Sequence, residues 1–316
     1  MSKYKKGEKI ATRQAYSDFL VDEGLLKEDL IVMDADLSGS TKTKAFAKKY
    51  PKRFVQSGIS EQDLMGEAAG IAATGHTVCA SSFAMFATGR AYEIIRNSIA
   101  ANGLDVKICA THAGITVGED GASHQTFEDI SLMRILPEMT VINPADAVSA
   151  RKLLGQSMEF NGPAYIRLGR SGVPVIYDEN DEIEIGKANI IKSGKDVTIL
   201  ATGIMVDSAI KAEKVLSEMN IDAEVIDIHT IKPLDEDAVI ASAKKTGKVV
   251  TAEEHSVIGG LGSAVAEVLA QKLPTKMAFV GQHDTFGESG KPNELRKKYK
   301  MTADDIVDAV KDILNK

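Results

Sequence analysis

The sequence is poor in cysteine and contains no apolar run long enough to span a bilayer. Its two cysteines, Cys79 and Cys109, lie inside apolar, strand-like stretches, which indicates buried free thiols rather than a disulfide or a metal pair. The first residues are charged and include no apolar segment, so they do not resemble a signal peptide. These absences predict a protein of the reducing cytoplasm with no membrane partner.

A basic stripe of the kind that binds nucleic acids is also missing. The 316 residues include 38 lysines and arginines against 45 aspartates and glutamates, which gives a net charge of −7. Hydrophobic residues make up 44% and charged residues 26%, values that are ordinary for a globular protein. The length allows two domains with separate cores. We therefore expect a soluble two-domain protein with no nucleic-acid partner.

Short runs rich in valine and isoleucine alternate with helical patterns along the whole chain. Strands are expected at residues 30–33, 106–110, 140–142, 164–167, 197–200, 223–228, 248–251 and 277–280, and helices at 62–73, 89–101, 145–158 and 206–219. This alternation predicts an α/β fold with two doubly wound domains, whose largely parallel sheets carry helices on both faces. An acidic, polar stretch at 175–196 separates the domains, which we place at 1–180 and 190–316.

A first candidate site residue is Glu61, which opens a helix after a strand-like segment. A carboxylate is electrostatically favoured at a helix start, and this alone explains Glu61 more simply than a functional role does. The rest of the helix is small and apolar, so it is expected to be buried and closely packed. Phe83 and Phe86 lie three residues apart and could line one wall of a site, although ordinary core packing explains an isolated aromatic pair as well.

A second group of candidates lies in the glycine-rich segment 111–125, which follows a predicted strand. It contains His112, Asp120 and His124 among several hydroxyl groups, and loops at the carboxyl ends of parallel strands are where α/β proteins keep their sites. The spacing of the histidines fits no known metal site, which favours catalytic or ligand-binding roles. Arg167 and Arg170, at the end of another strand, suit a phosphate or carboxylate, or they form a solvated strand end.

A glycine pair in the second half weakly matches a dinucleotide-binding fingerprint. Gly260 and Gly262 follow the strand at 248–251, but Val265 stands where the fingerprint requires glycine or alanine. Asp284 lies at roughly the distance of a ribose-binding acid. Close packing at a helix start is the favoured interpretation of these glycines.

Taken together, these stretches resemble the carboxyl-terminal half of transketolase, from residue 12 to the end of the chain. The segment 118–125 is the most specific match, and 283–292, which marks the family's terminal domain, is nearly as specific. Only the pyrimidine-binding and terminal domains of the family are matched. The Gly-Asp-Gly motif, which helps the family's third domain to hold Mg²⁺ and diphosphate, is absent from the sequence.

The resemblance therefore implies a split transketolase. It implies thiamine diphosphate as cofactor, and Mg²⁺ or another divalent ion held not by this chain but by a partner, the N-terminal transketolase subunit that carries the diphosphate-binding domain. It further implies an assembly of two chains of each kind, with the cofactor between unlike chains.

Residue by residue, the resemblance assigns the cofactor site as follows. Glu61 matches the carboxylate that bonds the ring nitrogen of the aminopyrimidine and thereby helps to activate the cofactor. Phe83 and Phe86 match the aromatic wall around this ring, and Asp36 and Leu37 match a pair beside the thiazolium. Transketolases often have a third aromatic residue one turn further on. Gly89 stands there in this sequence, so either the wall is more open or Tyr92 compensates.

The resemblance also assigns the substrate site. Asp120 matches an aspartate that binds a substrate hydroxyl, and His124 matches a histidine near the carbonyl oxygen and hydroxyls of the ketose. The residues that match the phosphate-binding set of the sugar are Arg13, Ser40, His112 and Arg170, and the fork geometry of arginine is apt for this task.

The implied activity is transfer of a two-carbon ketol unit from a ketose phosphate such as xylulose 5-phosphate to an aldose phosphate such as ribose 5-phosphate. This is a reaction of the pentose phosphate pathway. Ser60-Glu61-Gln62 is more typical of 1-deoxyxylulose 5-phosphate synthase or of the beta subunits of 2-oxo acid dehydrogenases, so these enzymes stay as alternatives. A non-catalytic assembly subunit is a further alternative, against which the intact Glu61, Asp120 and His124 argue.

Overall fold

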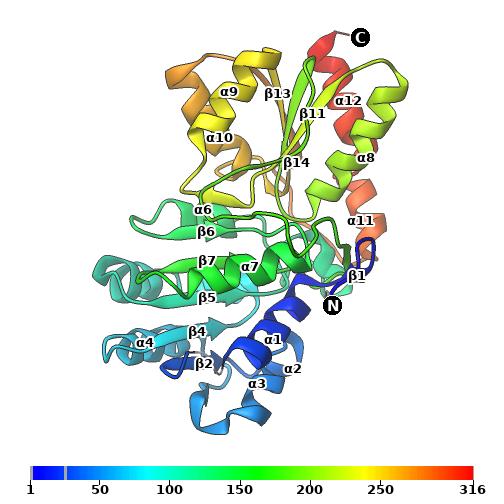
Figure 1. Ribbon diagram of the computed structural model, residues 1–316. Helices are drawn as coiled ribbons and strands as arrows, with labels where there is room; N and C mark the ends of the chain where they lie inside the picture. The colour runs from blue at the N-terminus through cyan, green and yellow to red at the C-terminus, as the bar shows by residue number, and fades with distance from the viewer. Residues whose placement is uncertain (1–2, 25–26, 316) are drawn as a thin grey trace.

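The computed structural model describes residues 3–24 and 27–315. They include two large sheets, one of which lies above the other in the view of Figure 1. The seven-stranded sheet has, in spatial order, β12 (Thr230–Lys232), β6 (Thr140–Ile142), β7 (Ala164–Arg167), β5 (Val106–Ala110), β4 (Thr77–Ser81), β2 (Leu30–Asp34) and β3 (Phe54–Gln56). The five-stranded sheet has β14 (Lys276–Gln282), β13 (Lys248–Ser256), β10 (Val197–Ala201), β11 (Ala223–Asp227) and β9 (Asn189–Lys192).

Parallel pairing dominates both sheets. In the described residues only the edge strands β12 and β9 pair antiparallel with their neighbours in these sheets. A separate antiparallel ribbon joins β1 (Lys9–Ile10) to β8 (Val173–Pro174). The predicted α/β class with largely parallel sheets is confirmed.

Each face of the seven-stranded sheet is covered by helices. Side chains alternate along its strands, so Cys79 of β4 packs in the apolar cluster of α1 (Thr12–Glu23) and α7 (Ala147–Ser157), while Val78 and Ala80 pack in the cluster of α4 (Glu61–Ala72). Because both faces are covered, the strands appear in the sequence as mainly apolar runs. The two cysteines are buried free thiols, as predicted.

The five-stranded sheet is covered in the same way. Helices α8 (Met205–Glu218) and α12 (Ala303–Leu314) pack together on one face, and α9 (Glu236–Thr246) and α10 (Leu261–Lys272) pack together on the other (Figure 1). The short helix α11 (Pro292–Lys298) runs back from this half to contact the 3-10 turn at Ile115–Asp120 of the first half. No helix in the described parts of the chain has the length and apolarity needed to cross a membrane.

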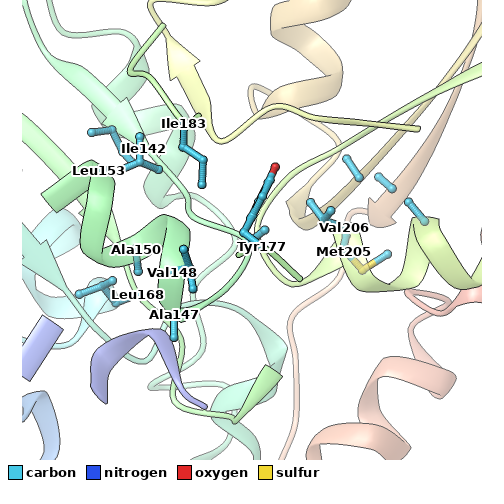
Figure 2. Packing of buried hydrophobic residues seen from close by; sticks show 14 of the residues in the cluster. Ile142, Ala147, Val148, Ala150, Leu153, Leu168, Tyr177, Ile183, Met205 and Val206 are labelled. Atoms are coloured by element: carbon cyan, nitrogen blue, oxygen red, sulfur yellow. The ribbon is translucent and has the colours of Figure 1, made fainter. Parts of the chain in front are cut away.

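One apolar cluster joins the two halves. It continues from Val148 and Leu153 on α7, through Tyr177, to Met205 and Val206 on α8 (Figure 2). The Tyr177 hydroxyl donates a hydrogen bond of 2.8 Å to the buried carboxylate of Asp227 at the end of β11. The polar stretch that separates the halves in the sequence is thus anchored to both of them.

A strand from the second half also completes the first sheet. β12 lies after the separating stretch in the sequence, yet it pairs with β6 at the edge of the seven-stranded sheet, and the Asn143 amide next to β6 donates to the His229 carbonyl at 2.8 Å. The sequence did not predict this pairing, because the pattern of apolar residues does not show which strands pair when they lie about 90 positions apart.

The segment 89–101, which was predicted to be helical, contains several types of helix in the structure. This segment continues from a π-helix at Met85–Arg90 through α5 (Tyr92–Ile94) to a second π-helix at Ile95–Ile99 and a 3-10 turn at Ala100–Asn102. The prediction of helical structure was right, and the structure adds that most of its turns are π-helical or 3-10 rather than α-helical. π-Helical turns accommodate an extra residue and occur often at functional sites.

Candidate active site

The predicted site residues follow neighbouring strands of the seven-stranded sheet. Asp36, Leu37 and Ser40 follow β2, Glu61 follows β3, Phe83 and Phe86 follow β4, His112, Asp120 and His124 follow β5, and Arg170 follows β7. Parallel strands end at the same edge, so this topology gathers the residues there. Arg13 joins them from the first turn of α1, whose start is fixed by a hydrogen bond of 2.7 Å from the Gly169 amide to Thr12 Oγ1.

Arg13, Ser40 and His112 form one end of the site. Nη1 of Arg13 donates to the Ser40 carbonyl at 2.8 Å and lies 3.1 Å from Nε2 of His112. Because a guanidinium can only donate, this imidazole nitrogen accepts, which leaves the ring proton on Nδ1, where Thr111 Oγ1 lies 2.8 Å away. Ser40 lies in the single helical turn Ser38–Thr41.

Electrostatics hold His112 in its neutral form. Burial, followed by the positive charges of Arg13 and Arg170, lowers the pKa of His112 to about 3. Burial and the charge of Arg170 also lower the pKa of Arg13. The two guanidinium groups therefore oppose one another across this end of the site, where an anion would stabilise both.

Arg170 itself is fixed by the loop that follows β5. Its Nη1 donates to the Val117 carbonyl at 2.7 Å and pairs with the Glu119 carboxylate at 2.9 Å. The other arginine noted in the sequence, Arg167, points elsewhere and forms a buried ion pair with Asp129 at 2.7 Å. The structure thus assigns only one of the two arginines to the site.

Aromatic rings continue from His112 along the site. The imidazole of His112 stacks on Phe83 with centroids 3.8 Å apart, and Phe83 stacks on Phe86 with centroids 6.1 Å apart and an angle of 16°. The His124 ring stands edge-on to Phe86 at 5.2 Å. The two phenylalanines and the two histidines therefore form one continuous group of rings.

Glu61 lies at the far end of this wall. Its side chain is 2% exposed, and its Oε2 accepts a hydrogen bond of 2.6 Å from Nη1 of Arg90. The Arg90 guanidinium carbon also lies 5.0 Å from the centroid of the Phe86 ring. Arg90 was not predicted as a site residue, although its neighbour Gly89 marked the place where the wall's third ring is missing.

Tyr92 does not compensate for that ring. Its half-buried side chain packs against the apolar cluster of α4, and within the described residues it makes no ring contact with Phe83 or Phe86. Within the described residues, no third ring therefore joins the wall, and the Arg90 guanidinium lies over the Phe86 ring at its end.

Asp36 and Leu37 occupy a turn that is shaped by a residue the sequence analysis missed. The buried carboxylate of Asp34 accepts hydrogen bonds from the Leu37 amide at 2.6 Å and from the hydroxyls of Thr41 and Thr43 at 2.6 and 2.9 Å. Burial raises the pKa of Asp34. Asp36 adopts a left-handed φ of 59° and is exposed.

Asp120 is exposed, and its side chain forms no hydrogen bond within the parts of the chain that the structure describes. The loop around it is nevertheless fixed, because Gln125 Nε2 donates to the Glu288 carbonyl at 2.9 Å. The two most specific sequence segments, 118–125 and 283–292, therefore contact each other.

Gly260 and Gly262, which weakly match a dinucleotide-binding fingerprint, allow close packing at the start of α10. The Glu253 carboxylate accepts hydrogen bonds from the amides of Leu261 and Gly262 at 2.7 and 2.8 Å, which occupies the start of α10. A Cβ atom on Gly260 would lie 2.0 Å from Glu253 Oε2. An anionic ligand at this helix start would meet a carboxylate, so the packing interpretation holds.

The donor set suits one kind of cofactor fragment. A buried carboxylate beside stacked phenylalanines fits a flat nitrogen heterocycle that donates a hydrogen bond. Within the described residues, no group of three or more histidine, cysteine, aspartate or glutamate side chains is arranged to hold a metal ion.

Comparison with known proteins gives two family matches. The model of the transketolase pyrimidine-binding domain matches residues 8–175, and that of the transketolase C-terminal domain matches residues 186–306. A Methanocaldococcus jannaschii protein named after the C-terminal section of transketolase is 48% identical over 96% of this chain and 96% of its own length. A 6-deoxy-6-sulfo-D-fructose transketolase subunit of Clostridium sp. is 43% identical over 95% of this chain and 94% of its own.

A solved structure agrees with these matches. It is an inactive β4 tetramer of a split-gene transketolase, 53% identical, which covers 97% of this chain and 99% of its own with a TM-score of 0.91.

Proposed function

Because this chain belongs to the transketolase family, we propose that it is one subunit of a two-chain enzyme that transfers a two-carbon ketol unit between sugar phosphates. The donor is a ketose phosphate such as xylulose 5-phosphate, and the acceptor is an aldose phosphate such as ribose 5-phosphate. The pyrimidine-binding domain spans about 1–180 and the terminal domain 190–316. The enzyme works in the cytoplasm, in the pentose phosphate pathway.

Glu61 is the residue on which the proposal depends most. When bound, thiamine diphosphate supplies the carbon nucleophile of ketol transfer. Glu61 holds a proton between its carboxylate and the ring nitrogen of the aminopyrimidine, and its 2% exposure keeps water from competing for that proton. Phe83 and Phe86 orient the ring by stacking, and the turn at Asp36 and Leu37 lines the thiazolium side.

The cationic end of the site binds the substrate's anionic group. Arg13 and Arg170 oppose one another there, and the Arg13 Nε hydrogen is buried without a partner in the described structure, so an oxygen of the anion would satisfy it. Ser40 and neutral His112 complete this end. The wall of rings joins it to Glu61, and this arrangement is the single observation that carries the proposal.

His124 and Asp120 act between these two ends. His124, edge-on to Phe86, lies beside the wall and donates to the carbonyl oxygen and hydroxyls of the ketose. Asp120, which is exposed on the fixed loop, accepts a hydrogen bond from a substrate hydroxyl.

The diphosphate and its Mg²⁺ belong to the partner subunit. This chain has no Gly-Asp-Gly motif, and a relative that is 53% identical is described as an inactive tetramer of beta chains alone. We infer an active assembly of two such chains with two partners that carry the diphosphate-binding domain.

A coupled assay tests the proposal. Xylulose 5-phosphate, ribose 5-phosphate, thiamine diphosphate and Mg²⁺ are supplied to this chain with and without the partner chain. Activity is expected only in the mixture, and Glu61→Gln is expected to reduce it about 100-fold or more without preventing assembly. Glu67→Gln, an exposed change on the same helix, is the matched control. Activity of the lone chain would contradict the split, and an unaffected E61Q complex would indicate a non-catalytic assembly subunit.

A second donor class deserves the same assay. The relative that is 43% identical is a subunit of a 6-deoxy-6-sulfo-D-fructose transketolase, and a sulfonate could occupy the cationic end as a phosphate does. Preference for the sulfonated ketose would assign the chain to that class. Turnover of 2-oxo acids in place of ketoses would favour the 2-oxo acid dehydrogenase or deoxyxylulose phosphate synthase type.

A further inference from the structure

The buried carboxylate of Glu61 is neutralised by a cation that is half in solvent. The Glu61 side chain is 2% exposed, whereas that of Arg90 is 51% exposed, and Nη1 of Arg90 lies 2.6 Å from Glu61 Oε2. Within the described parts of the chain, this is the only hydrogen bond that either side chain makes. A carboxylate as buried as Glu61 requires such a partner, because an unpaired buried charge is strongly destabilising.

The guanidinium of Arg90 also covers the end of the aromatic wall. Its central carbon lies 5.0 Å from the centroid of Phe86, within the range of a cation–π contact. Arg90 therefore fills the corner between Glu61 and Phe86 with a flat, cationic group that donates hydrogen bonds. A protonated aminopyrimidine is also flat and cationic, and its protonated ring nitrogen donates a hydrogen bond. The two groups would compete for the same carboxylate and the same ring.

We propose that Arg90 is a placeholder that pairs with Glu61 while the subunit is empty and is displaced when the pyrimidine ring binds. This inference rests on the proposed function, which puts the pyrimidine against Glu61. Arg90 is a positioning residue in this scheme, since it regulates access to Glu61 and takes no part in the reaction.

The local structure allows this movement. Arg90 is the last residue of the π-helix Met85–Arg90, and Gly89 before it is exposed and has no side chain to obstruct the guanidinium. The displaced arginine returns to water, where it regains its hydration. Glu61 passes from one hydrogen-bond donor to another and is never left buried without a partner.

The placeholder has a measurable cost in affinity. A site that is closed part of the time binds its ligand more weakly, in proportion to the fraction that is open. Removing the arginine should therefore tighten cofactor binding. A permanent structural role would predict the opposite, because the loss of a supporting ion pair loosens a site.

The test uses the complex with the diphosphate-binding partner. Binding of thiamine diphosphate in the presence of Mg²⁺ is measured by titration calorimetry for the wild type, Arg90→Gln and Arg90→Lys. We expect R90Q to bind the cofactor about threefold more tightly or better, R90K to lie between, and the free R90Q subunit to melt at a lower temperature. Arg96→Gln is the matched control, since Arg96 lies on the same helical run and, among the described residues, its side chain bonds only to its exposed neighbour Asn97.

Weaker binding by R90Q, or unchanged binding by both variants, would overturn the inference. R90K retains the positive charge, so it provides the affinity comparison even where R90Q is too unstable to assemble. The assay of E61Q keeps the two hypotheses apart. If the E61Q complex is fully active, the proposed function fails. If E61Q is inactive and R90Q binds thiamine diphosphate no more tightly than the wild type does, only the inference that Arg90 is a placeholder fails.

Discussion

Gln125 and Glu288 tie the loop of the site to the terminal half, because Gln125 Nε2 donates to the Glu288 carbonyl at 2.9 Å across 163 positions of sequence. The approach of the two segments is close elsewhere as well. A Cβ atom on Gly287 would lie 1.8 Å from Oε1 of Gln125, and one on Gly121 would lie 2.5 Å from Oγ of Ser289. The position of His124 and Asp120 therefore depends on the second half of the chain.

Gly121→Ala is expected to lower both stability and activity. Gly121 has a φ of 77°, which disfavours a side chain, and the added methyl group would push the loop away from Ser289. We expect a loss of about 2 kcal/mol or more in the free energy of unfolding, measured in urea, and a raised KM for the ketose. Gly75→Ala separates the two causes, since Gly75 has a φ of 93° and open space around it. Equal losses in both variants would contradict a role for the contact with Ser289.

His112→Asn is expected to make stability less dependent on pH. The pKa of His112 is about 3 in the folded protein, against an ordinary value of 6.5, because of burial and of the charges of Arg13, Arg170, His124 and Lys42. Between these values the unfolded chain binds a proton that the folded chain does not, so His112 lowers stability as the pH falls from 6.5 towards 3.

Urea unfolding at a series of pH values tests this. The wild type should lose stability more steeply than H112N as the pH falls below 6.5, and asparagine tolerates the left-handed φ of 58° at this position. His229→Asn offers a parallel case, since burial lowers the pKa of His229 to about 4. Identical slopes for the wild type and H112N would show that His112 titrates normally.

Arg167→Met is expected to destabilise the protein strongly. Arg167 pairs with Asp129 at 2.7 Å, with 4% and 0% of the two side chains exposed, and its Nη2 donates to the Glu254 carbonyl of the other half. Loss of the guanidinium would leave a buried carboxylate, with an expected cost of about 3–5 kcal/mol. Lys6→Met, which removes an exposed pair with Asp178, should change little in the same urea titration. A small effect of R167M would mean that water or Tyr165 compensates Asp129.

The two cysteine thiols should not react with a thiol reagent in the folded protein. Cys79 and Cys109 are fully buried, and burial raises the pKa of the Cys109 thiol well above its usual value. A thiolate is the reactive form, so a colorimetric thiol reagent should detect neither cysteine until denaturant is added, and then both. Rapid reaction of the native chain would reveal local opening of β4 or β5.

Much of this fold could be predicted from apolar runs. Strands such as β5 and β7 are buried on both faces, so most of their side chains are apolar, and the two charged ones, Lys107 and Arg167, are paired with carboxylates. The edge where the site lies also follows from the sequence, because the polar segment 111–125 directly follows one of these strands. Direct reasoning from the residues suggested the histidines, and the family resemblance supplied the roles of Arg13, Ser40 and Asp36.

The features that the sequence did not predict are contacts between residues that lie far apart along the chain. Arg90 meets Glu61 across 29 positions of sequence, and no periodicity indicates which arginine will face a carboxylate. Asp34 was not singled out from the sequence, and only the structure shows the threonines whose hydroxyls it binds. The π-helical turns that place Arg90 need an inserted residue, which a pattern based on 3.6 residues per turn cannot register.

The pairing of β12, a strand of the second half, with β6 in the first sheet has a consequence for how such an enzyme can be divided between genes. A cut in the acidic stretch 175–196 would remove β12 from the first fragment and leave β6 with an unpaired hydrogen-bonding edge. Exposed edges of this kind pair with other chains and cause aggregation. We therefore expect a chain divided within 175–196 to give a first fragment that aggregates, whereas a division before or after the two sheets leaves this edge covered.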